Sequence, residues 1–539
     1  MFFILHRYIL RELSKVFVLS TIALTLIMSL GSILRPIQDY GVGPGQVVDL
    51  LLYFIPITLT FVLPLSALFA AALVYGRFAA DNELDACRAS GISLWSVMYP
   101  GLVLAIIVAT ANLLLSFYVV PDFFHRAERS LKADAKQILF RNIQRKGFYE
   151  SPDKEYRIYA DEADMHNDTL LGVVVTRVEK NRIQRIITTE KASVNFAPRK
   201  NYNEVQIIAR DLYEMAGENS RWGYVGQLPI NFEFPSLLGD DIKFKKINEM
   251  KEIRANPLEF YPIENIARQV NAQYAAELLA QDISQAMSAE PNGFYELRGE
   301  PNSVKFSVAN AAANTEINSD QKDVILSGQV VVVEFDTRSD EPVRTWSCEQ
   351  ALLRIEGDEF NPTLKLEMLS PRWQNIDGSE GIAAGRKFVR GLLLPADVAR
   401  KVVRDDVLES ISPRAVGAAL QNGPSNKLQN LQRRLQINIR EARVDILAEV
   451  HTRLVFGMSC IPLIFIGIGL GIILRGGHLL SAFGVSAMPA GLLVVFIMMG
   501  KNVAKNSGVG LTAGLLLMWS GFAVMILLAA AILHKLLKN

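Results

Sequence analysis

The sequence is poor in the residues and motifs on which most enzymes depend. It has three cysteines and six dispersed histidines in 539 residues. It contains no G-x-x-x-x-G-K-[ST] phosphate loop, no H-E-x-x-H metal pair, no G-x-S-x-G elbow and no C-x-x-C pair. Charged residues make up only 21%, below the roughly 25% of ordinary soluble chains. We therefore expect no catalytic residues, no cofactor and no metal.

The sequence instead contains long runs of uncharged residues. Six of them lie at residues 16–34, 50–75, 92–120, 454–474, 479–500 and 509–533. Because about 20 apolar residues cross a bilayer core as a helix, each run is predicted to be a transmembrane helix. This pattern excludes a soluble enzyme, a disordered chain and an outer-membrane barrel, whose strands are short and alternating.

Basic residues in the short connections predict the orientation, because they stay preferentially in the cytoplasm. With the N-terminus inside, the cytoplasmic pieces hold eight basic residues, and the short outer loops hold only Arg35, Lys501 and Lys505. We therefore expect both termini in the cytoplasm and residues 121–453 on the outer side. The first run is longer than a signal-peptide core and no cleavage site follows it, so it is interpreted as a retained span.

The chain is expected to have three parts, namely residues 1–120 with three spans, an outside domain at 121–453, and residues 454–539 with three more spans. Residues 121–453 hold 45 Lys+Arg and 49 Asp+Glu, a net charge of −4, while the rest carries +5. A mildly acidic soluble domain argues against nucleic acid as a partner. The three cysteines fall in different compartments, so no disulfide is expected.

The outside domain is predicted to be an all-β domain of antiparallel strands, whose two groups of strand segments form either one lobe or two. Short segments rich in β-branched and aromatic residues indicate strands, at 156–159, 172–178, 185–189, 192–196, 205–209, 224–234, 324–335, 343–347, 351–355, 364–369 and 387–394. Helices are expected at 121–142, 263–287 and 428–450, the last running into the fourth span.

The six spans contain no charged residue. Ion-coupled transporters usually need an intramembrane acid or base, so the energy for any transport is expected to come from a partner. Gly467, Gly469 and Gly471 superficially suggest a nucleotide fingerprint. Because they lie in an apolar span, close helix packing is the better interpretation.

The connection at about residues 77–91 carries Asp81, Glu83, Leu84, Arg88 and Gly91. A cap at Asp81 or Asn82 and a stop at Gly91 predict a short helix on the cytoplasmic face. Such a helix is a plausible contact for a motor protein. A solvated loop is the alternative interpretation.

Several stretches of the sequence form a recognisable combination. His6-Arg-Tyr-Ile-Leu-Arg-Glu12 stands near the N-terminus, and Asp81-x-Glu83-Leu84 is followed by Arg88-Ala-Ser-Gly91-Ile-Ser93. Glu449-Val-His-Thr-Arg-Leu454 precedes the fourth span, and Tyr156-Arg-Ile-Tyr159-Ala160 and Leu171-Gly-Val173 lie in the outside domain. Together these motifs resemble those of the LptF/LptG family of permeases, which extract lipopolysaccharide from the bacterial inner membrane. The last two resemble the first strands of the family's periplasmic jelly roll.

The resemblance implies a 3+3 arrangement of spans around a periplasmic jelly-roll-like domain, in the inner membrane. It implies a second permease copy or paralogue, an LptB-like cytoplasmic ATPase dimer that binds the coupling helix, and periplasmic LptC/LptA-like proteins. The coupling-helix glutamate corresponds to Glu83. The cation that meets lipid phosphates at the outer end of the first span corresponds to Arg35.

An anionic lipid head group needs cations at the outer membrane edge, where arginine pairs with phosphate bidentately and lysine acts as a point charge. The candidates near that edge are Arg35, Arg126, Arg129, Arg453, Lys501 and Lys505. The alternative for each is a snorkelling anchor at a helix end.

Typical members of the family are shorter, and the excess lies between about residues 240 and 437. It is interpreted either as an extra lobe or as a replacement for a separate periplasmic subunit. The favoured function is that of a lipopolysaccharide export permease. The alternatives are a permease for another lipid or lipoprotein, and a non-transporting scaffold or sensor with a periplasmic binding domain.

Overall fold

The computed structural model describes most of the chain. The described residues are 2–40, 44–133, 135–151, 156–179, 182–198, 202–216, 223–235, 240–290, 293–299, 302–316, 323–336, 342–358, 361–375, 379–382, 386–402, 406–474, 479–505 and 510–538. They divide into two compact units. We call Met1–Ile138, Ser236–Ala255 and Arg440–Asn539 the helical unit, and Leu139–Pro235 and Asn256–Ile439 the β unit.

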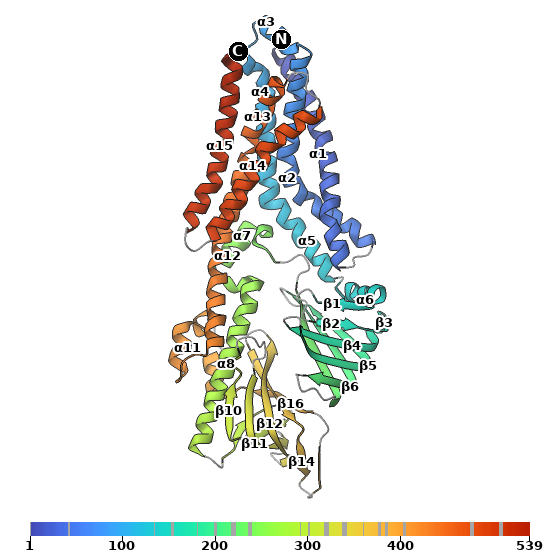
Figure 1. The fold of residues 1–539 in the computed structure, drawn as a ribbon, viewed down its shortest axis with the longest axis vertical. Coiled ribbons are helices and arrows are strands. Elements are labelled where there is room, and N and C mark those ends of the chain that lie inside the picture. Colours follow the sequence, from blue (N-terminus) through green and yellow to red (C-terminus); the bar gives the residue numbers. More distant parts are fainter. Residues whose placement is uncertain are drawn as a thin grey trace. The chain divides into compact units, whose positions relative to one another are not determined.

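The helical unit contains six helices that are long and apolar enough to cross a membrane, which confirms the predicted number among the residues described. Its helices are α1 (Phe2–Tyr40), α2 (Pro44–Ala80), α3 (Glu83–Ala89), α4 (Leu94–Leu114), α5 (Val120–Ala133), α7 (Ile247–Ala255), α13 (Cys460–Ile473), α14 (Leu479–Lys505), α15 (Gly510–Lys538) and the C-terminal half of α12 (Asn426–Met458) (Figure 1). A π-helical turn at Leu115–Val119 joins α4 to α5 without a break.

Glycines bring α2 and α13 into direct backbone contact. A Cβ atom on Gly467 would lie 2.5 Å from the Leu68 carbonyl oxygen, and one on Gly471 would lie 2.3 Å from that of Ala72. Without side chains at these positions the helices pack at a distance that no larger residue allows. This confirms that the glycine-rich stretch serves close helix packing.

In the described residues, the first sheet of the β unit, sheet A, has seven antiparallel strands in the order β1-β2-β4-β5-β6-β7, with β3 paired to β4. The strands are β1 (Phe148–Glu150), β2 (Tyr156–Tyr159), β3 (Glu162–Asp164), β4 (Thr169–Glu179), β5 (Arg182–Pro198), β6 (Tyr202–Ala216) and β7 (Gly223–Pro235). The helix α6 (Ala135–Lys146) precedes them. The helix predicted at 121–142 falls on α5 and α6, which are described on either side of residue 134.

The second sheet, sheet B, has nine antiparallel strands among the residues that the structure describes, in the order β15-β14-β12-β11-β9-β8, with β10, β13 and β16 branching from this path. The strands are β8 (Tyr295–Leu297), β9 (Asn302–Ser307), β10 (Asn310–Ala313), β11 (Asp323–Asp336), β12 (Pro342–Asp358), β13 (Asn361–Leu369), β14 (Arg372–Asn375), β15 (Glu380–Ile382) and β16 (Arg386–Leu393). Helix α8 (Tyr261–Ala289) precedes them, and α9 (Ala396–Val402), α10 (Val407–Ser410), α11 (Pro413–Ala419) and the start of α12 follow.

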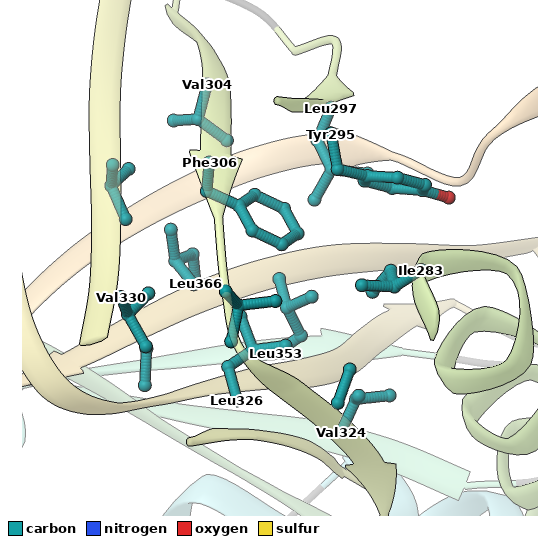
Figure 2. Close-up of a cluster of buried hydrophobic side chains, with 14 of the residues drawn as sticks. Ile283, Tyr295, Leu297, Val304, Phe306, Val324, Leu326, Val330, Leu353 and Leu366 are labelled. Atoms are coloured by element: carbon teal, nitrogen blue, oxygen red, sulfur yellow. The ribbon is translucent and has the colours of Figure 1, made fainter. Parts of the chain in front are cut away.

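Sheet B curls back on itself, and its interior is a packed core. The N–H of Leu393 in β16 donates to the carbonyl of Arg298, 2.7 Å away, just after β8. Inside the curl, side chains such as Phe306, Leu353 and Leu366 are completely or almost completely buried, and Ile283 of α8 joins them (Figure 2). Because this interior is filled by its own side chains, it leaves no open apolar channel within the described core.

Two pairs of predicted strands are continuous in the structure. The segments 185–189 and 192–196 are both part of β5, and 343–347 and 351–355 are both part of β12. The residues between the two members of each pair continue the strand. In β12 a register shift against β11, between Ser327 and Val330, absorbs the change of face.

Candidate functional site

The short helix α3 lies between α2 and α4, at the same end of the helical unit as both chain termini (Figure 1). Asn82 precedes it in the left-handed conformation, with φ 58°, and makes no side-chain cap. At its other end the N–H of Gly91 donates to Arg88 and the N–H of Ile92 to Cys87, both at 3.0 Å. This is a Schellman ending, and the positive φ of Gly91, 77°, explains why glycine stands there.

One buried side chain and one hydrogen bond fasten α3 to the membrane helices. Leu84 is 3% exposed and belongs to a core that also contains Ile9 of α1 and Ile468 of α13. The guanidinium of Arg88 donates to the carbonyl of Leu536 in α15, 3.2 Å away. A force applied to α3 therefore reaches several spans through direct contacts.

Neighbouring contacts tie the spans together at this end. His6 of α1 lies within hydrogen-bonding distance of the Ser96 carbonyl in α4, at 2.8 Å, and its ring packs near Tyr99 with centroids 5.4 Å apart. The Tyr75 hydroxyl of α2 donates to the carbonyl of Val97, 2.9 Å away. The first, second and fourth helices are thus locked together next to α3.

The outer face of α3 is acidic. Asp81 and Glu83 are exposed, and Asp85 is half-buried. Asp81 makes only a loose contact with Arg77, at 3.8 Å. Exposed carboxylates on a rigidly held helix can receive a basic side chain from another protein without any rearrangement of the core.

The predicted lipid-binding cations lie in different settings. The side chain of Arg35 is outside the described residues. Arg126 and Arg129 lie on α5 and are exposed, and the guanidinium carbon of Arg126 lies 5.6 Å from the ring centroid of Phe123. These two cations are accessible to an anionic ligand.

Arg453, Lys501 and Lys505 instead contact carboxylates of α12. The Nε of Arg453 lies 3.1 Å from Glu449 Oε1, and its Nη2 donates to the carbonyls of Lys243 and Lys245, at 2.9 and 3.2 Å. Lys501 also pairs with Glu449, at 2.5 Å, and Lys505 pairs with Asp445, at 2.9 Å. The structure thus brings three of the six predicted cations together around two acids.

Residues 240–255, which we call the docked segment, belong to the helical unit although they lie between the two sheets in the chain. Ile242, Met250 and Ile253 are buried. The ring of Phe244 stacks on Phe124 of α5, with centroids 3.8 Å apart. The segment therefore joins α5 on one side and, through Arg453, α12 on the other.

Charge pairs reinforce this docking. Lys246 pairs with Asp122, and the Nε2 of His125 lies 2.9 Å from Glu249 Oε1. Burial acts to raise the pKa of the Glu249 carboxyl, but its hydrogen bonds to His125 and to the N–H of Lys246 outweigh burial, so that pKa lies below its usual value. Glu249 is therefore held in its charged form.

The pairs differ in how strongly they bind. Arg453 has a 3% exposed side chain, and breaking a buried pair typically costs about 3–5 kcal/mol. Lys505 and its partner Asp445 are 45% and 29% exposed, and exposed pairs contribute about 0.2–1 kcal/mol. Arg453 is thus a fixed structural contact, whereas the lysine pairs open at low cost.

The docked segment was not among the sites predicted from the sequence. Its signal is faint, namely Phe244 among lysines and an apolar pair, Met250 and Ile253, at helical spacing.

Among the residues that the structure describes, no group of three His, Cys, Asp or Glu side chains is arranged to hold a metal ion.

The family is decided by comparison with known protein families. The model of the family described as lipopolysaccharide export system permease LptF/LptG matches residues 7–279 and 317–535. The chain belongs to the LptF/LptG family. No curated protein matches it in a sequence search.

Membership in the LptF/LptG family implies a permease subunit of lipopolysaccharide export, a multi-pass protein of the inner membrane and no enzyme. The match extends across most of the region 240–437 that we interpreted as excess. It omits residues 280–316, which contain the end of α8 and strands β8 to β10.

Proposed function

We propose that this chain is a permease subunit that extracts lipopolysaccharide with energy from a separate ATPase. The observation that carries the proposal is the construction of α3, an acidic and exposed helix fixed to several spans by Leu84 and Arg88. An LptB-like ATPase dimer would bind this helix, and Glu83 would receive a basic side chain of the ATPase. Closure of the ATPase would then move the spans.

The cargo site follows from the chemistry of lipopolysaccharide, which combines acyl chains with a phosphorylated head group. We propose that Arg35, Arg126 and Arg129 hold the head-group phosphates at the outer edge of the spans. Arg126 and Arg129 are exposed on α5, as this role requires. Lys501 and Lys505 join them only when their carboxylate partners release them, and Arg453 keeps the helices in place.

We propose a topology in which both termini are cytoplasmic and the β unit is periplasmic, inserted between the third and fourth spans. A second permease, either a copy or a paralogue, would complete the membrane pathway. Lipid would pass from there to LptC/LptA-like proteins.

We place the periplasmic route at sheet A, because β2 and β4 carry the segments that resemble the family's jelly roll. Sheet B has an interior filled by its own side chains and by α8, so acyl chains would have to displace a packed core. Sheet A also buries apolar residues, including Val175, Ile187 and Ile207. A route through sheet A therefore requires its strands to part, which we expect only while lipid passes.

Co-purification tests this proposal. The tagged full-length chain should bring an ATPase with it, and mass spectrometry of the retained lipid should find lipopolysaccharide. Glu83→Arg should lose the ATPase, whereas the charge-neutral Glu83→Gln should retain part of it. Retention of a different lipid would indicate another lipid permease, and a complex without ATPase and lipid would indicate a scaffold or sensor.

A further inference from the structure

Helices α12 and α14 are joined by two parallel ion pairs, which we call the ion ladder. Asp445 and Glu449 stand one turn apart on α12, and Lys505 and Lys501 stand one turn apart on α14. The Nζ of Lys501 lies 2.5 Å from Glu449 Oε2, and that of Lys505 lies 2.9 Å from Asp445 Oδ2. Because both pairs have the same spacing, any shift of α14 along or away from α12 breaks them together.

The lysines of the ion ladder are far more exposed than Arg453, the second cationic partner of Glu449. The side chains of Lys501 and Lys505 are 32% and 45% exposed, whereas Arg453 on the other side of Glu449 is 3% exposed. When Lys501 leaves, Glu449 keeps a cationic partner in Arg453. Asp445 is 29% exposed, so water can solvate it when Lys505 leaves. Opening of the ladder therefore leaves each carboxylate with either a cation or water as its partner.

Phosphate competes well for such lysines. A lysine ammonium is a flexible point charge with three donors, so it can turn to a new partner without moving its helix first. A phosphate monoester carries more negative charge than a carboxylate and offers three acceptor oxygens. Arg453 cannot be taken in this way, because its guanidinium is also bound to two backbone carbonyls of the docked segment.

We propose that the ion ladder is a phosphate-operated latch on α14. In the structure the latch is closed on Asp445 and Glu449. The phosphates of a passing lipid head group take over Lys501 and Lys505, and the outer end of α14 separates from α12. Arg453 meanwhile holds α12 to the docked segment, so only α14 moves. This inference rests on the proposed function, because it assumes a phosphorylated lipid as cargo.

The distance between α12 and α14 tests the latch directly. Spin labels at Arg443→Cys and Met498→Cys, both exposed positions, report that distance in the full-length chain with its ATPase and permease partners in nanodiscs. A Cys87→Ser background removes the half-buried thiol, and the other two cysteines are buried. We expect the distance to increase with lipopolysaccharide and to stay unchanged with lipopolysaccharide whose phosphates have been removed enzymatically.

Inorganic phosphate separates the two possible sources of the anion. An increase of the distance with inorganic phosphate alone, and none with phosphorylated lipopolysaccharide, would overturn the assignment to a lipid. No change with phosphorylated lipopolysaccharide, in a complex that still releases lipid with ATP, would overturn the latch and leave the proposed function intact. Loss of ATP-dependent lipid release in the unaltered complex would instead count against the proposed function.

Two variants distinguish a latch from a purely structural contact. Asp445→Asn opens one rung and removes the carboxylate that competes with phosphate for Lys505, while both lysines and the Glu449–Arg453 pair stay in place. We therefore expect a longer distance without lipid, and lipid capture at least as strong as in the unaltered complex. The double variant Lys501→Gln/Lys505→Gln should also open the ladder, and should weaken lipid binding roughly twofold to fivefold for each lysine. Lys535→Gln/Lys538→Gln on α15 is the matched control for charge and should change neither. Equal lipid capture by the Asp445 variant and the double lysine variant would contradict the latch.

Discussion

Arg453 and Glu449 stand one turn apart on α12 and form a pair at 3.1 Å between Nε and Oε1 with almost no exposure of the arginine. The same guanidinium holds the backbone of the docked segment at Lys243 and Lys245. The Arg453 side chain thus pairs with the charge of Glu449 and also attaches the docked segment to α12. The two carbonyls that it binds lie 210 and 208 residues earlier in the chain.

Arg453→Ala should strongly destabilise the helical unit. The change leaves two backbone carbonyls without a donor and removes one of the two cations at Glu449, and breaking a buried pair costs about 3–5 kcal/mol. The free energy of unfolding in a denaturing-detergent titration measures this loss. Arg126→Ala, at an exposed arginine of α5, is the control, and we expect a change within about 0.5 kcal/mol. Equal losses in both variants would mean that Arg453 is not a fixed contact.

Gly471→Ala should separate α2 from α13. Its new methyl group would lie 2.3 Å from the Ala72 carbonyl oxygen, a distance that real Cβ atoms do not reach. Overpacking of this kind costs about 1–3 kcal/mol. Gly491→Ala on α14 meets nothing within 4 Å and serves as the control in the same unfolding titration. A stable Gly471→Ala protein would contradict the close contact.

The two neighbouring residues Glu83 and Leu84 should fail in different ways when changed. Leu84→Ala creates a cavity under α3 and should lower the free energy of unfolding by about 2–5 kcal/mol. Glu83→Arg reverses an exposed charge and should leave stability unchanged while ATPase binding is lost. Unfolding titrations and ATPase pull-downs on both variants separate the two effects. Normal ATPase binding by Glu83→Arg would remove Glu83 from the contact.

The docked segment should loosen in acid. Because the pKa of Glu249 in the folded chain lies below that of the unfolded chain, about 4.3, its charge stabilises docking above that pH, and this contribution is lost as the pH falls through the lower folded value. Hydrogen-exchange protection of the α7 amides, corrected for the intrinsic pH effect, measures this. Glu249→Gln should already show reduced protection at pH 7 and less further loss in acid. The same acid loss in both proteins would assign the effect to another group.

Hydrophobic run length predicted the six apolar helices because a membrane span needs only local composition. Many strands of sheets A and B were also predicted, because a high content of β-branched and aromatic residues is a local signal as well. Short strands such as β8 and β14 were missed because they are held by pairing with distant partners and not by their own residues. The joining of 343–347 with 351–355 depends on a register shift at Gly328 of the facing strand β11, so residues 343–355 do not reveal it by themselves.

The candidate site was predictable only in part. The helix α3 was predicted from the sequence, because the cap at Asp81 or Asn82 and the stop at Gly91 are local signals. The sequence also marked Arg453, Lys501 and Lys505 as cations near the outer membrane edge. It gave no sign that Asp445 and Glu449 would meet them, because that contact depends on how α14 lies against α12. The binding of lipid head groups by these cations therefore stays a prediction. It requires that their ion pairs with Asp445 and Glu449 break first.

The most direct test of the account is ATP-dependent release of lipopolysaccharide from reconstituted vesicles. Vesicles containing this chain, its permease partner and the ATPase should release lipopolysaccharide to a periplasmic acceptor when ATP is added. Those with Glu83→Arg, or without the ATPase, should release none above background. Release by the permeases alone, at the same rate without the ATPase, would contradict the account.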